Sequence, residues 1–205
     1  MQAFRSKSFR FGLGLGFLFF VFSSVFGVVH AEGYPSLEQI EALGQEDRIH
    51  PKNCRGLNAE SPELLEILMS WQKSGGAHEN IARVLLRHLH EAEFYTFYHY
   101  LLVCNPSGEL MAMAEYKVYP FADHGTNMTF VQHLLGNPYQ RGGGTAAIRH
   151  LVRESLLTGV ESLQLMATES SVGFYQKLGF RSQMKHEMTY YFLTEQDMIR
   201  RYFPR

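Results

Sequence analysis

The chain of 205 residues is 45% hydrophobic, 14% aromatic and 19% charged, so it holds enough apolar material for one packed core with appendages. This composition excludes a disordered or a fibrous protein. The formal charge of −1, from 19 basic and 20 acidic residues, disfavours a strongly basic nucleic-acid binder, and we expect no nucleic-acid partner.

The amino terminus has the order of an export signal. Residues 1–10 carry three basic groups and no acidic one, residues 11–29 are uncharged, and Val29-His30-Ala31 fits a signal-peptidase site. The 19 uncharged residues exceed the ~7–15 of a usual signal and reach the ~17–25 that can span a bilayer. Residues 1–31 are therefore either a signal peptide, which the pattern favours, or a signal anchor. We expect an exported protein, periplasmic or secreted, with a membrane anchor through residues 11–29 as the alternative.

Without residues 1–31 the chain keeps 16 basic and 20 acidic residues, a formal charge of −4, and is mildly acidic. Its only cysteines, Cys54 and Cys104, are too few for a disulfide scaffold and lack C-x-x-C spacing. They can form one disulfide in an oxidising compartment, but isolated thiols are more often inert, so the sequence favours free thiols. Residues 32–60, which are polar and interrupted by prolines and glycines, predict an N-terminal extension or lid.

Residues 61–205 predict one domain that begins with two helices. Ser61-Pro62-Glu63 offers an N-cap, a proline at the first helical position and an early acidic residue, and this helix is expected to end near Ser74. Gly75-Gly76 separates it from a second helix, which is indicated by an apolar stripe at Ile81, Val84, Leu85 and Leu89.

The hydrophobic period then changes to two residues, which predicts strands. Two strands form an antiparallel hairpin around a turn at 105–108, and a third strand leads into a helix that starts at glycines. A strand, a short helix and one long final strand follow. The predicted strands are 94–104, 109–119, 126–136, 162–168 and 180–193, and the predicted helices between them are 142–159 and 170–178.

Three glycines stand between the third strand and the next helix, in Asn137-Pro138-Tyr139-Gln140-Arg141-Gly142-Gly143-Gly144-Thr145. Glycine permits a sharp turn and the close approach of a ligand, and the first amides of a helix suit a phosphate or pyrophosphate. Such a turn is as often a plain loop as an anion site. It is not a P-loop, because no Lys-Ser/Thr pair follows, and it is not a G-x-G-x-x-G dinucleotide fingerprint.

A second motif follows in Phe174-Tyr175-Gln176-Lys177-Leu178-Gly179-Phe180, a short helix that ends in glycine. With both motifs the chain resembles the GNAT superfamily of N-acetyltransferases over about residues 63–193. In that family an R/Q-x-x-G-x-G/A loop binds the pyrophosphate of acetyl-CoA, and an F-Y-x-x-L-G-F helix lies on the cofactor's other side. The resemblance implies an α/β (α+β) fold with a mixed, mostly antiparallel central sheet flanked by helices, and acetyl-CoA as co-substrate.

Two registers of the loop motif fit the sequence. Arg141-x-x-Gly144-x-Ala146 keeps the family's proline three residues earlier, whereas Gln140-x-x-Gly143-x-Thr145 keeps the phase of the helix, and both stay open. The resemblance implies cofactor-binding residues at the end of the third strand, where backbone groups face pantetheine and the carbonyl, and in the loop. These residues are Leu134, Leu135, Gly136, Gln140, Arg141, Gly142, Gly143, Gly144 and Thr145.

Acetyl transfer from a thioester to an amine needs a deprotonated amine, a donor to the oxyanion and a proton for the thiolate. The resemblance places Tyr175 near the cofactor sulfur as general acid, which suits a phenol with a pKa of ~10, and the competing interpretation is a core aromatic residue. Glu115 and His133 are the candidates for the base, and histidine has the better unperturbed pKa. A lone polar residue on a strand usually faces solvent, so each is more often structural.

The pair His88 and His90 is the one pattern that suggests a metal. Two residues apart on a helix, the two side chains point in different directions. The sequence therefore predicts no metal site.

These observations favour an acetyl-CoA-dependent N-acetyltransferase whose acceptor amine, on a small molecule or on a protein or peptide, is not specified. The alternative is a non-catalytic exported binding or effector module that retains the fold, because acetyl-CoA is an intracellular metabolite and an exported enzyme would lack its donor. Delivery into the cytosol of another cell would reconcile the two. Membrane contact is expected only through an uncleaved amino-terminal segment, and the sequence indicates no oligomeric state.

Overall fold

The computed structural model describes residues 34–45, 47–91, 95, 97–119, 127–185 and 188–204. The chain divides into two units, Met1–Tyr34 and Pro35–Arg205, and every described helix and strand belongs to the second. The expected signal peptide or anchor, residues 1–31, lies outside the described residues. In the part of the chain that is described, no helix has the length and apolar character needed to cross a membrane.

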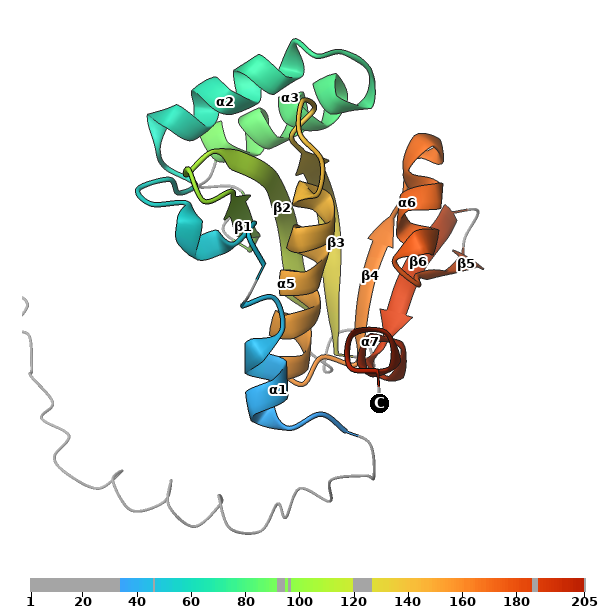
Figure 1. Cartoon of the computed structure of the whole chain (residues 1–205). Coiled ribbons are helices and arrows are strands. Elements are labelled where there is room, and N and C mark those ends of the chain that lie inside the picture. Colours follow the sequence, from blue (N-terminus) through green and yellow to red (C-terminus); the bar gives the residue numbers. More distant parts are fainter. Residues whose placement is uncertain are drawn as a thin grey trace, which may run out of the picture. The chain divides into compact units, whose positions relative to one another are not determined.

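A six-stranded sheet forms the centre of the second unit, with the spatial order β1-β2-β3-β4-β6-β5 (Figure 1). All neighbouring strands are antiparallel except β3 and β4, which are parallel. This confirms the expected α/β fold with a mixed, mostly antiparallel sheet. The strands are β1 (His99–Cys104), β2 (Leu110–Tyr119), β3 (Met128–Gly136), β4 (Ser162–Met166), β5 (Arg181–Lys185) and β6 (Met188–Thr194).

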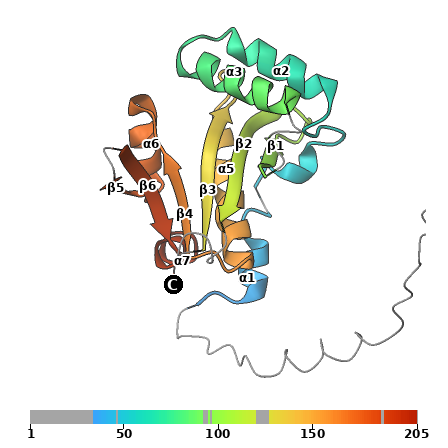
Figure 2. The ribbon, with the colours of Figure 1, turned by 180° about the vertical axis from the view of Figure 1, so that it is seen from behind.

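Helices pack on both faces of the sheet. α5 contacts β1 to β4 on one face, so that it lies in front of the strands in Figure 1 and behind them in Figure 2. The antiparallel pair α2 and α3 packs on the opposite face of β1 to β3. The helices are α1 (Leu37–Ala42), α2 (Pro62–Gln72), α3 (Gly76–His90), α5 (Gly143–Leu157), α6 (Val172–Lys177) and α7 (Glu195–Tyr202), with short 3-10 turns η2 (Pro51–Asn53) and η3 (Glu169–Ser171).

Alternation along β1 divides the core between these two helical layers. Leu102 and Cys104 join the cluster under α2 and α3, whereas Val103 joins the cluster under α5, because successive side chains of a strand point to opposite faces. Each large aliphatic side chain buried in this way contributes about 1.5–3 kcal/mol. The fully buried helical members of the first cluster are Leu64, Leu68, Ala82 and Leu85, and Trp71, the single tryptophan, is 3% exposed beside them.

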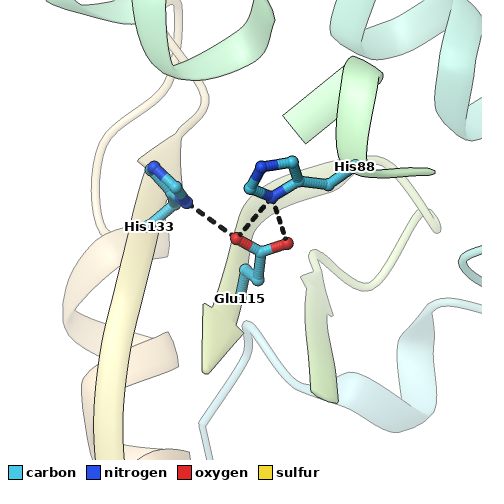
Figure 3. Close-up of side chains that lie close together, drawn as sticks. All are labelled: His88, Glu115 and His133. Atoms are coloured by element: carbon cyan, nitrogen blue, oxygen red, sulfur yellow. Dashed lines mark hydrogen bonds and ion pairs between the residues drawn. The ribbon is translucent and has the colours of Figure 1, made fainter. Parts of the chain in front are cut away.

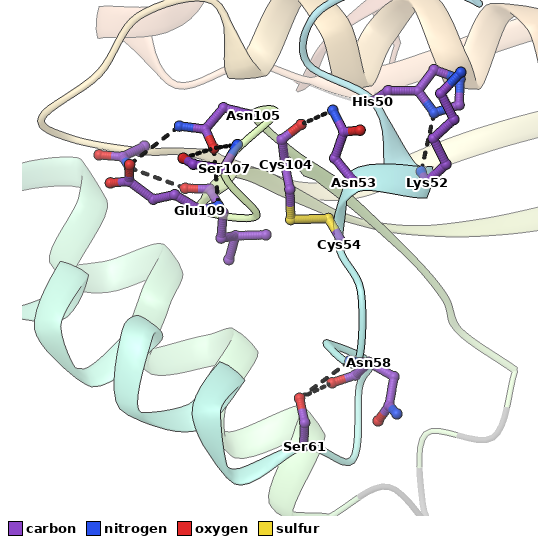
Figure 4. Close-up of a disulfide and its surroundings, with 12 residues drawn as sticks. His50, Lys52, Asn53, Cys54, Asn58, Ser61, Cys104, Asn105, Ser107 and Glu109 are labelled. Carbon is purple, nitrogen blue, oxygen red and sulfur yellow. Dashed lines mark hydrogen bonds between the residues drawn. A yellow bond between two sulfur atoms is a disulfide. The ribbon is translucent and has the colours of Figure 1, made fainter.

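From Pro35 on, the polar extension belongs to the same unit as the rest of the domain, and its turn η2 packs against β1. Two backbone hydrogen bonds of 2.9 and 3.3 Å join His50 to Cys104, and the side-chain amide of Asn53 donates to the Cys104 carbonyl at 3.1 Å. A disulfide joins Cys54 to Cys104 at the same place (Figure 4). The expectation of free thiols is therefore wrong: the fold brings two cysteines 50 residues apart to the end of β1.

The carboxyl-terminal region differs from the single long strand expected over 180–193. It forms the antiparallel hairpin of β5 and β6 and then α7, whose capping box pairs Thr194 with Asp197. The residues between β5 and β6 contain no glycine or proline, so no turn signal marks the break. The other expected elements are present, although β1 begins at His99, later than predicted.

Candidate active site

The parallel pair β3 and β4 separates before β3 ends. The ladder joins only Met128–Val131 of β3 to Ser162–Leu165 of β4, and Figure 1 shows the two strands diverging above it. From 132 to 136, within the described residues, β3 has no ladder partner on β4, whereas His133 to Gly136 stay paired with β2. Its backbone groups on the β4 side are thus free of strand pairing, which a ligand lying between the two strands can use.

The end of β3 leads directly into the start of α5. Gly142 is the N-cap, with a φ of 100° in the left-handed region that favours glycine, and it provides no side-chain cap. The amides of the first helical turn, Gly143 to Thr145, therefore have neither an intrahelical acceptor nor a capping side chain at the N-cap. Together with the positive end of the helix dipole they suit a phosphate group.

The glycines of this turn serve different purposes. A Cβ on Gly143 would lie 1.9 Å from the carbonyl oxygen of Met111 on β2, so this glycine is required for packing. A Cβ on Gly144 would lie 3.2 Å from the ring of Phe174 on α6, and one on Gly136 would lie 4.0 Å from the amide nitrogen of Gly144. The end of β3, the first turn of α5 and the start of the second motif thus meet at one place.

Tyr175 lies in an aromatic cluster on the β4 to β6 side of the sheet. It is 7% exposed, and its ring centroid lies 5.0 Å from that of Phe174, 5.5 Å from Phe180 and 6.4 Å from Tyr191. Burial raises the pKa of Tyr175 to about 12, so the phenol stays protonated at neutral pH. Its ring is a core residue, and its hydroxyl remains a proton donor.

A buried carboxylate joins two histidines on the other side of β3. The Nδ1 atom of His88 lies 2.9 and 3.1 Å from the two carboxylate oxygens of Glu115, and Nδ1 of His133 lies 2.7 Å from Oε2 (Figure 3). Glu115 is fully buried, His88 is 5% exposed, and the side chain of His133 is 19% exposed. Of the three groups, His133 is therefore the one that a substrate can reach most easily. We call these residues the His–Glu–His cluster.

Strand register and helix packing bring this cluster together. Glu115 on β2 is directly opposite His133 on β3 and Tyr100 on β1, so the three share one face of the sheet. The register of the β2–β3 pair shifts just after Glu115, where Gln132 of β3 is the extra residue without a partner on β2. His88 lies in the last turn of α3, which packs against β3.

The hydrogen bonds determine which nitrogen of each ring carries the proton. Burial alone would raise the pKa of Glu115, but the hydrogen bonds from His133 and His88 outweigh it and lower this pKa below its ordinary value. An ionised carboxylate only accepts hydrogen bonds, so each neutral ring donates from Nδ1 and keeps its lone pair on Nε2. Figure 3 shows the second ring nitrogen of His133 pointing away from Glu115. The result is an imidazole that a buried carboxylate orients.

Tyrosines of the segment before β1 surround the cluster. The ring of His88 stacks on those of Tyr95 and Tyr98, with centroids 4.0 and 5.6 Å apart, and Lys117 lies 4.0 Å from the centroid of the Tyr98 ring. The hydroxyl of Tyr100 is buried without a well-formed hydrogen bond among the described residues. Burial and then the charge of Glu115 raise the pKa of Tyr100. This is a polar, aromatic environment that a substrate or ion could complete.

The sequence profile of the acetyltransferase (GNAT) family matches residues 62–180, more than half of the chain. The chain belongs to the GNAT family of acetyltransferases. Its acetyl-CoA co-substrate, expected from the two motifs, is confirmed with this assignment. The matched region begins at α2 and ends after the Phe174–Phe180 motif, so the cluster and both cofactor motifs lie inside it. No curated protein matches this GNAT chain significantly in sequence.

Solved structures of similar fold agree with the family assignment. The toxin AtaT, as a point mutant bound to the C-terminus of the antitoxin AtaR, has a TM-score of 0.52 at 16% identity, covering 67% of this chain and 90% of the other. The same mutant with acetyl-CoA also bound has a TM-score of 0.50 at 16% identity, covering 66% and 91%. A GNAT-family protein from Desulfovibrio desulfuricans has a TM-score of 0.50 at 16% identity, covering 66% and 95%. At this identity the likeness shows the fold.

The GNAT fold brings some of the expected site residues together and separates others. The expected cofactor residues at the end of β3 and in the loop are adjacent, and Glu115 and His133 are hydrogen-bonded. Neither faces solvent as a lone strand residue usually does, because the α2–α3 pair covers this face of the sheet. Tyr175 lies in the separate aromatic cluster. His88 is the functional candidate that sequence reasoning missed, although a polar residue in the apolar stripe of Ile81 and Leu85 signals a buried partner.

Proposed function

We propose that this protein transfers the acetyl group of acetyl-CoA to an amine at the junction of β3, α5 and the His–Glu–His cluster. The observation that carries the proposal is the continuity of three features. These are the strand end of β3 without a β4 partner, the uncapped first turn of α5, and His133, three residues before the end of β3. A thioester bound along this edge is within reach of a base on the same strand.

The cofactor is proposed to bind through backbone groups. Leu134, Leu135 and Gly136 would offer N–H and C=O groups to pantetheine and to the reacting carbonyl. The first-turn amides of α5 would bind the pyrophosphate, with Arg141 as a solvent-exposed cation beside them. Because Gly143 is occupied with packing on Met111, the Arg141-x-x-Gly144-x-Ala146 register is the one we favour for the loop motif.

The amine is proposed to lose its proton to His133. Glu115 accepts a hydrogen bond from Nδ1–H of this ring, so Nε2 carries the lone pair and is the atom that takes a proton from the incoming amine. As the amine nitrogen bonds to the thioester carbon, the positive charge that develops on the imidazole is stabilised by the buried carboxylate. Glu115 is thus a positioning residue and His133 the base.

The leaving group is proposed to receive its proton from Tyr175. When the carbon–sulfur bond breaks, the departing CoA thiolate needs one proton, and the Tyr175 phenol is protonated throughout the neutral range. The tyrosinate is reprotonated from solvent after CoA leaves. The reaction consumes one acetyl-CoA and one amine and produces one amide and one CoA thiol.

The acceptor is proposed to be an amine on a small molecule or on a protein or peptide. Tyr95 and Tyr98, which stack on His88, border the cluster on the side where the acceptor would bind. Aromatic surface of this kind accepts the apolar or cationic body of either class. We still expect no nucleic-acid partner, because the net charge of the chain is close to neutral.

A second function is favoured by one specific observation. The Cys54–Cys104 disulfide is typical of an oxidising compartment, and it supports the proposed export by residues 1–31 into a place without acetyl-CoA. An exported GNAT fold there would act as a binding or effector module without catalysis. Delivery into a second cytosol would restore the donor. Mass spectrometry of the native amino terminus tests whether residues 1–31 are removed or retained as an anchor.

The test is an acetyl-CoA titration followed by measurement of CoA thiol release with spermidine, glucosamine and a lysine-containing peptide as amines. We expect saturable acetyl-CoA binding and release above the amine-free rate with at least one of them. Arg141→Glu should weaken acetyl-CoA binding about tenfold, whereas Arg55→Glu, an equally exposed control on the extension, should not. Absence of binding at millimolar acetyl-CoA overturns the proposal, and binding without release under all amines favours the second function.

A further inference from the structure

The His–Glu–His cluster has the composition of a transition-metal site. Two imidazole nitrogens and one carboxylate oxygen form the donor set that zinc and related divalent ions take in proteins with three protein ligands and one open position. In the described part of the chain, this is the single group of three or more such side chains whose donor atoms lie within 4.8 Å of one another. The three residues come from α3, β2 and β3, so only the folded protein assembles them.

We propose that His88, Glu115 and His133 bind one divalent ion of the zinc class, and that this ion inhibits the protein. The Nδ1 atoms of His88 and His133 lie 3.1 and 2.7 Å from Oε2 of Glu115, and one donor atom from each of the three residues lies within 4.8 Å of the others. Zinc bonds of about 2.0–2.2 Å in tetrahedral geometry place the ligand atoms about 3.3–3.6 Å apart, which lies between these values. A small movement of the two rings is enough.

The surroundings favour an ion over an empty cluster. Glu115 is fully buried, and within the described residues no lysine or arginine forms an ion pair with it. A buried carboxylate without a permanent cation is costly, and a divalent ion would neutralise it more completely than two neutral rings. The hydroxyl of Tyr100, directly across the strand pair from Glu115 and without a well-formed hydrogen bond there, can bond to a water in the open metal position.

The ion would act as an inhibitor and not as a cofactor. To ligate metal, each ring moves its proton from Nδ1 to Nε2, with no net release of protons from the neutral rings. His133 then carries N–H at the very atom that must accept the amine proton, and Glu115 no longer orients it. This inhibition rests on the proposed function of His133, whereas the binding of the ion does not.

The test is a cobalt(II) titration of the full chain purified without an added histidine tag, with zinc(II) as competitor. Both cysteines are in the disulfide, so a cobalt spectrum should show visible bands of nitrogen and oxygen ligands without sulfur charge transfer. We expect one ion per chain, and a loss of affinity of about tenfold or more in both His88→Gln and Glu115→Gln. His90→Gln, an exposed histidine on the same helix, should bind as the wild type does.

Further measurements distinguish the loss of the metal site from unfolding of the variant and from loss of its catalytic activity. Trp71 fluorescence and acetyl-CoA binding report whether each variant is folded, and zinc should raise the thermal midpoint of the wild type but not of His88→Gln. No saturation at millimolar cobalt, or equal binding by wild type and both ligand variants, overturns the proposal. Zinc should also suppress CoA release by the wild type and by His90→Gln, and persistent release from the zinc-loaded protein overturns the inhibitory part.

Discussion

The two sides of the β3–β4 junction are built differently. On the β1 to β3 side, the helix pair α2–α3 covers a charged hydrogen-bonded cluster, and a disulfide attaches the extension to β1. On the β4 to β6 side, the interior around Tyr175 is a group of packed aromatic rings. The strand at this edge of the sheet is β5, and it is exposed. On the first side, contacts between distant segments of the chain position the functional residues. On the second side, a motif that is contiguous in sequence positions Tyr175.

Under the proposed mechanism, the two sides have separate tasks. The amine side needs a base with a defined tautomer, and the fixed carboxylate of Glu115 provides it. The sulfur side needs a neutral donor, and a buried phenol meets this need without any partner. Changes on the β1 to β3 side should therefore affect both catalysis and stability, whereas changes at the Tyr175 hydroxyl should affect catalysis alone.

The largest expected effect comes from His133→Gln. Loss of the base should lower kcat/KM for the best amine by about 10²–10³-fold, within the range of general base catalysis. Steady-state CoA release measures it, and acetyl-CoA affinity should change little because the loop and β3 backbone are untouched. His90→Gln is the matched control. A loss below tenfold in His133→Gln would show that another group removes the proton.

The next effect is on stability, from the double substitution of Cys54 and Cys104 by serine. Opening a disulfide that joins cysteines 50 residues apart should lower the free energy of unfolding by about 2–4 kcal/mol. Urea unfolding followed by Trp71 fluorescence measures this loss. Wild-type protein with dithiothreitol should lose the same amount. A change below about 1 kcal/mol would mean that the backbone bonds between His50 and Cys104 already hold the extension in place.

The substitution Tyr175→Phe tests the proposed proton donor on the β4 to β6 side. It keeps the ring packing and removes the proton donor, so we expect kcat to fall about 10²-fold, about 2.7 kcal/mol in the barrier, with the thermal midpoint unchanged. Tyr191→Phe, in the same aromatic cluster, should leave kcat unchanged. Equal kinetics in the two variants would make Tyr175 a packing residue only.

The smallest effect is a pH dependence of stability at the contact between α5 and the extension. Burial, followed by the charge of His50, lowers the pKa of His150 to about 4, with Asp47, Arg149 and Arg153 nearby. The unfolded chain protonates this histidine below about pH 6.5 while the folded chain does not, so stability falls as pH drops from about 6.5 towards 4. We expect a loss on the order of 2 kcal/mol.

Unfolding free energies of the wild type and His150→Gln at pH 7 and pH 5 measure this dependence. The variant should be less sensitive to pH, since glutamine does not titrate. Parallel pH profiles of the two proteins would place the sensitivity elsewhere. His150 is 4% exposed and its Nε2 has no hydrogen-bond partner among the described residues, which is why its protonation should be unfavourable in the folded state.

Much of the fold could be predicted because its signals are local. Proline at the start of α2, the glycines before α5 and the alternating first half of β3 are each readable within a few residues. The hairpin of β5 and β6 could not, because its turn lacks glycine and proline and its exposed strand lacks an apolar pattern.

For the site as well, the parts with local sequence signals could be predicted and the parts that depend on long-range contacts could not. The cofactor loop and Tyr175 belong to contiguous motifs, whereas the cluster depends on strand register and on the packing of α3 against β3. Glu115 and His133 could be nominated by residue type, but their direct pairing follows from a register that no local pattern specifies. A prediction of His88 as a site residue would have required knowing which strand α3 packs against. The disulfide was hidden for the same reason, because it depends on the path of the extension.

The most direct measurement is the protonation state of His133 by nitrogen NMR of protein labelled with ¹⁵N-histidine, assigned by comparison with His133→Gln. If Glu115 orients this ring as base, Nδ1 carries the proton and Nε2 is bare at neutral pH, and the Glu115→Gln variant loses this preference. A proton on Nε2 of His133 in the metal-free wild type at neutral pH would contradict the assignment of this histidine as the amine's base.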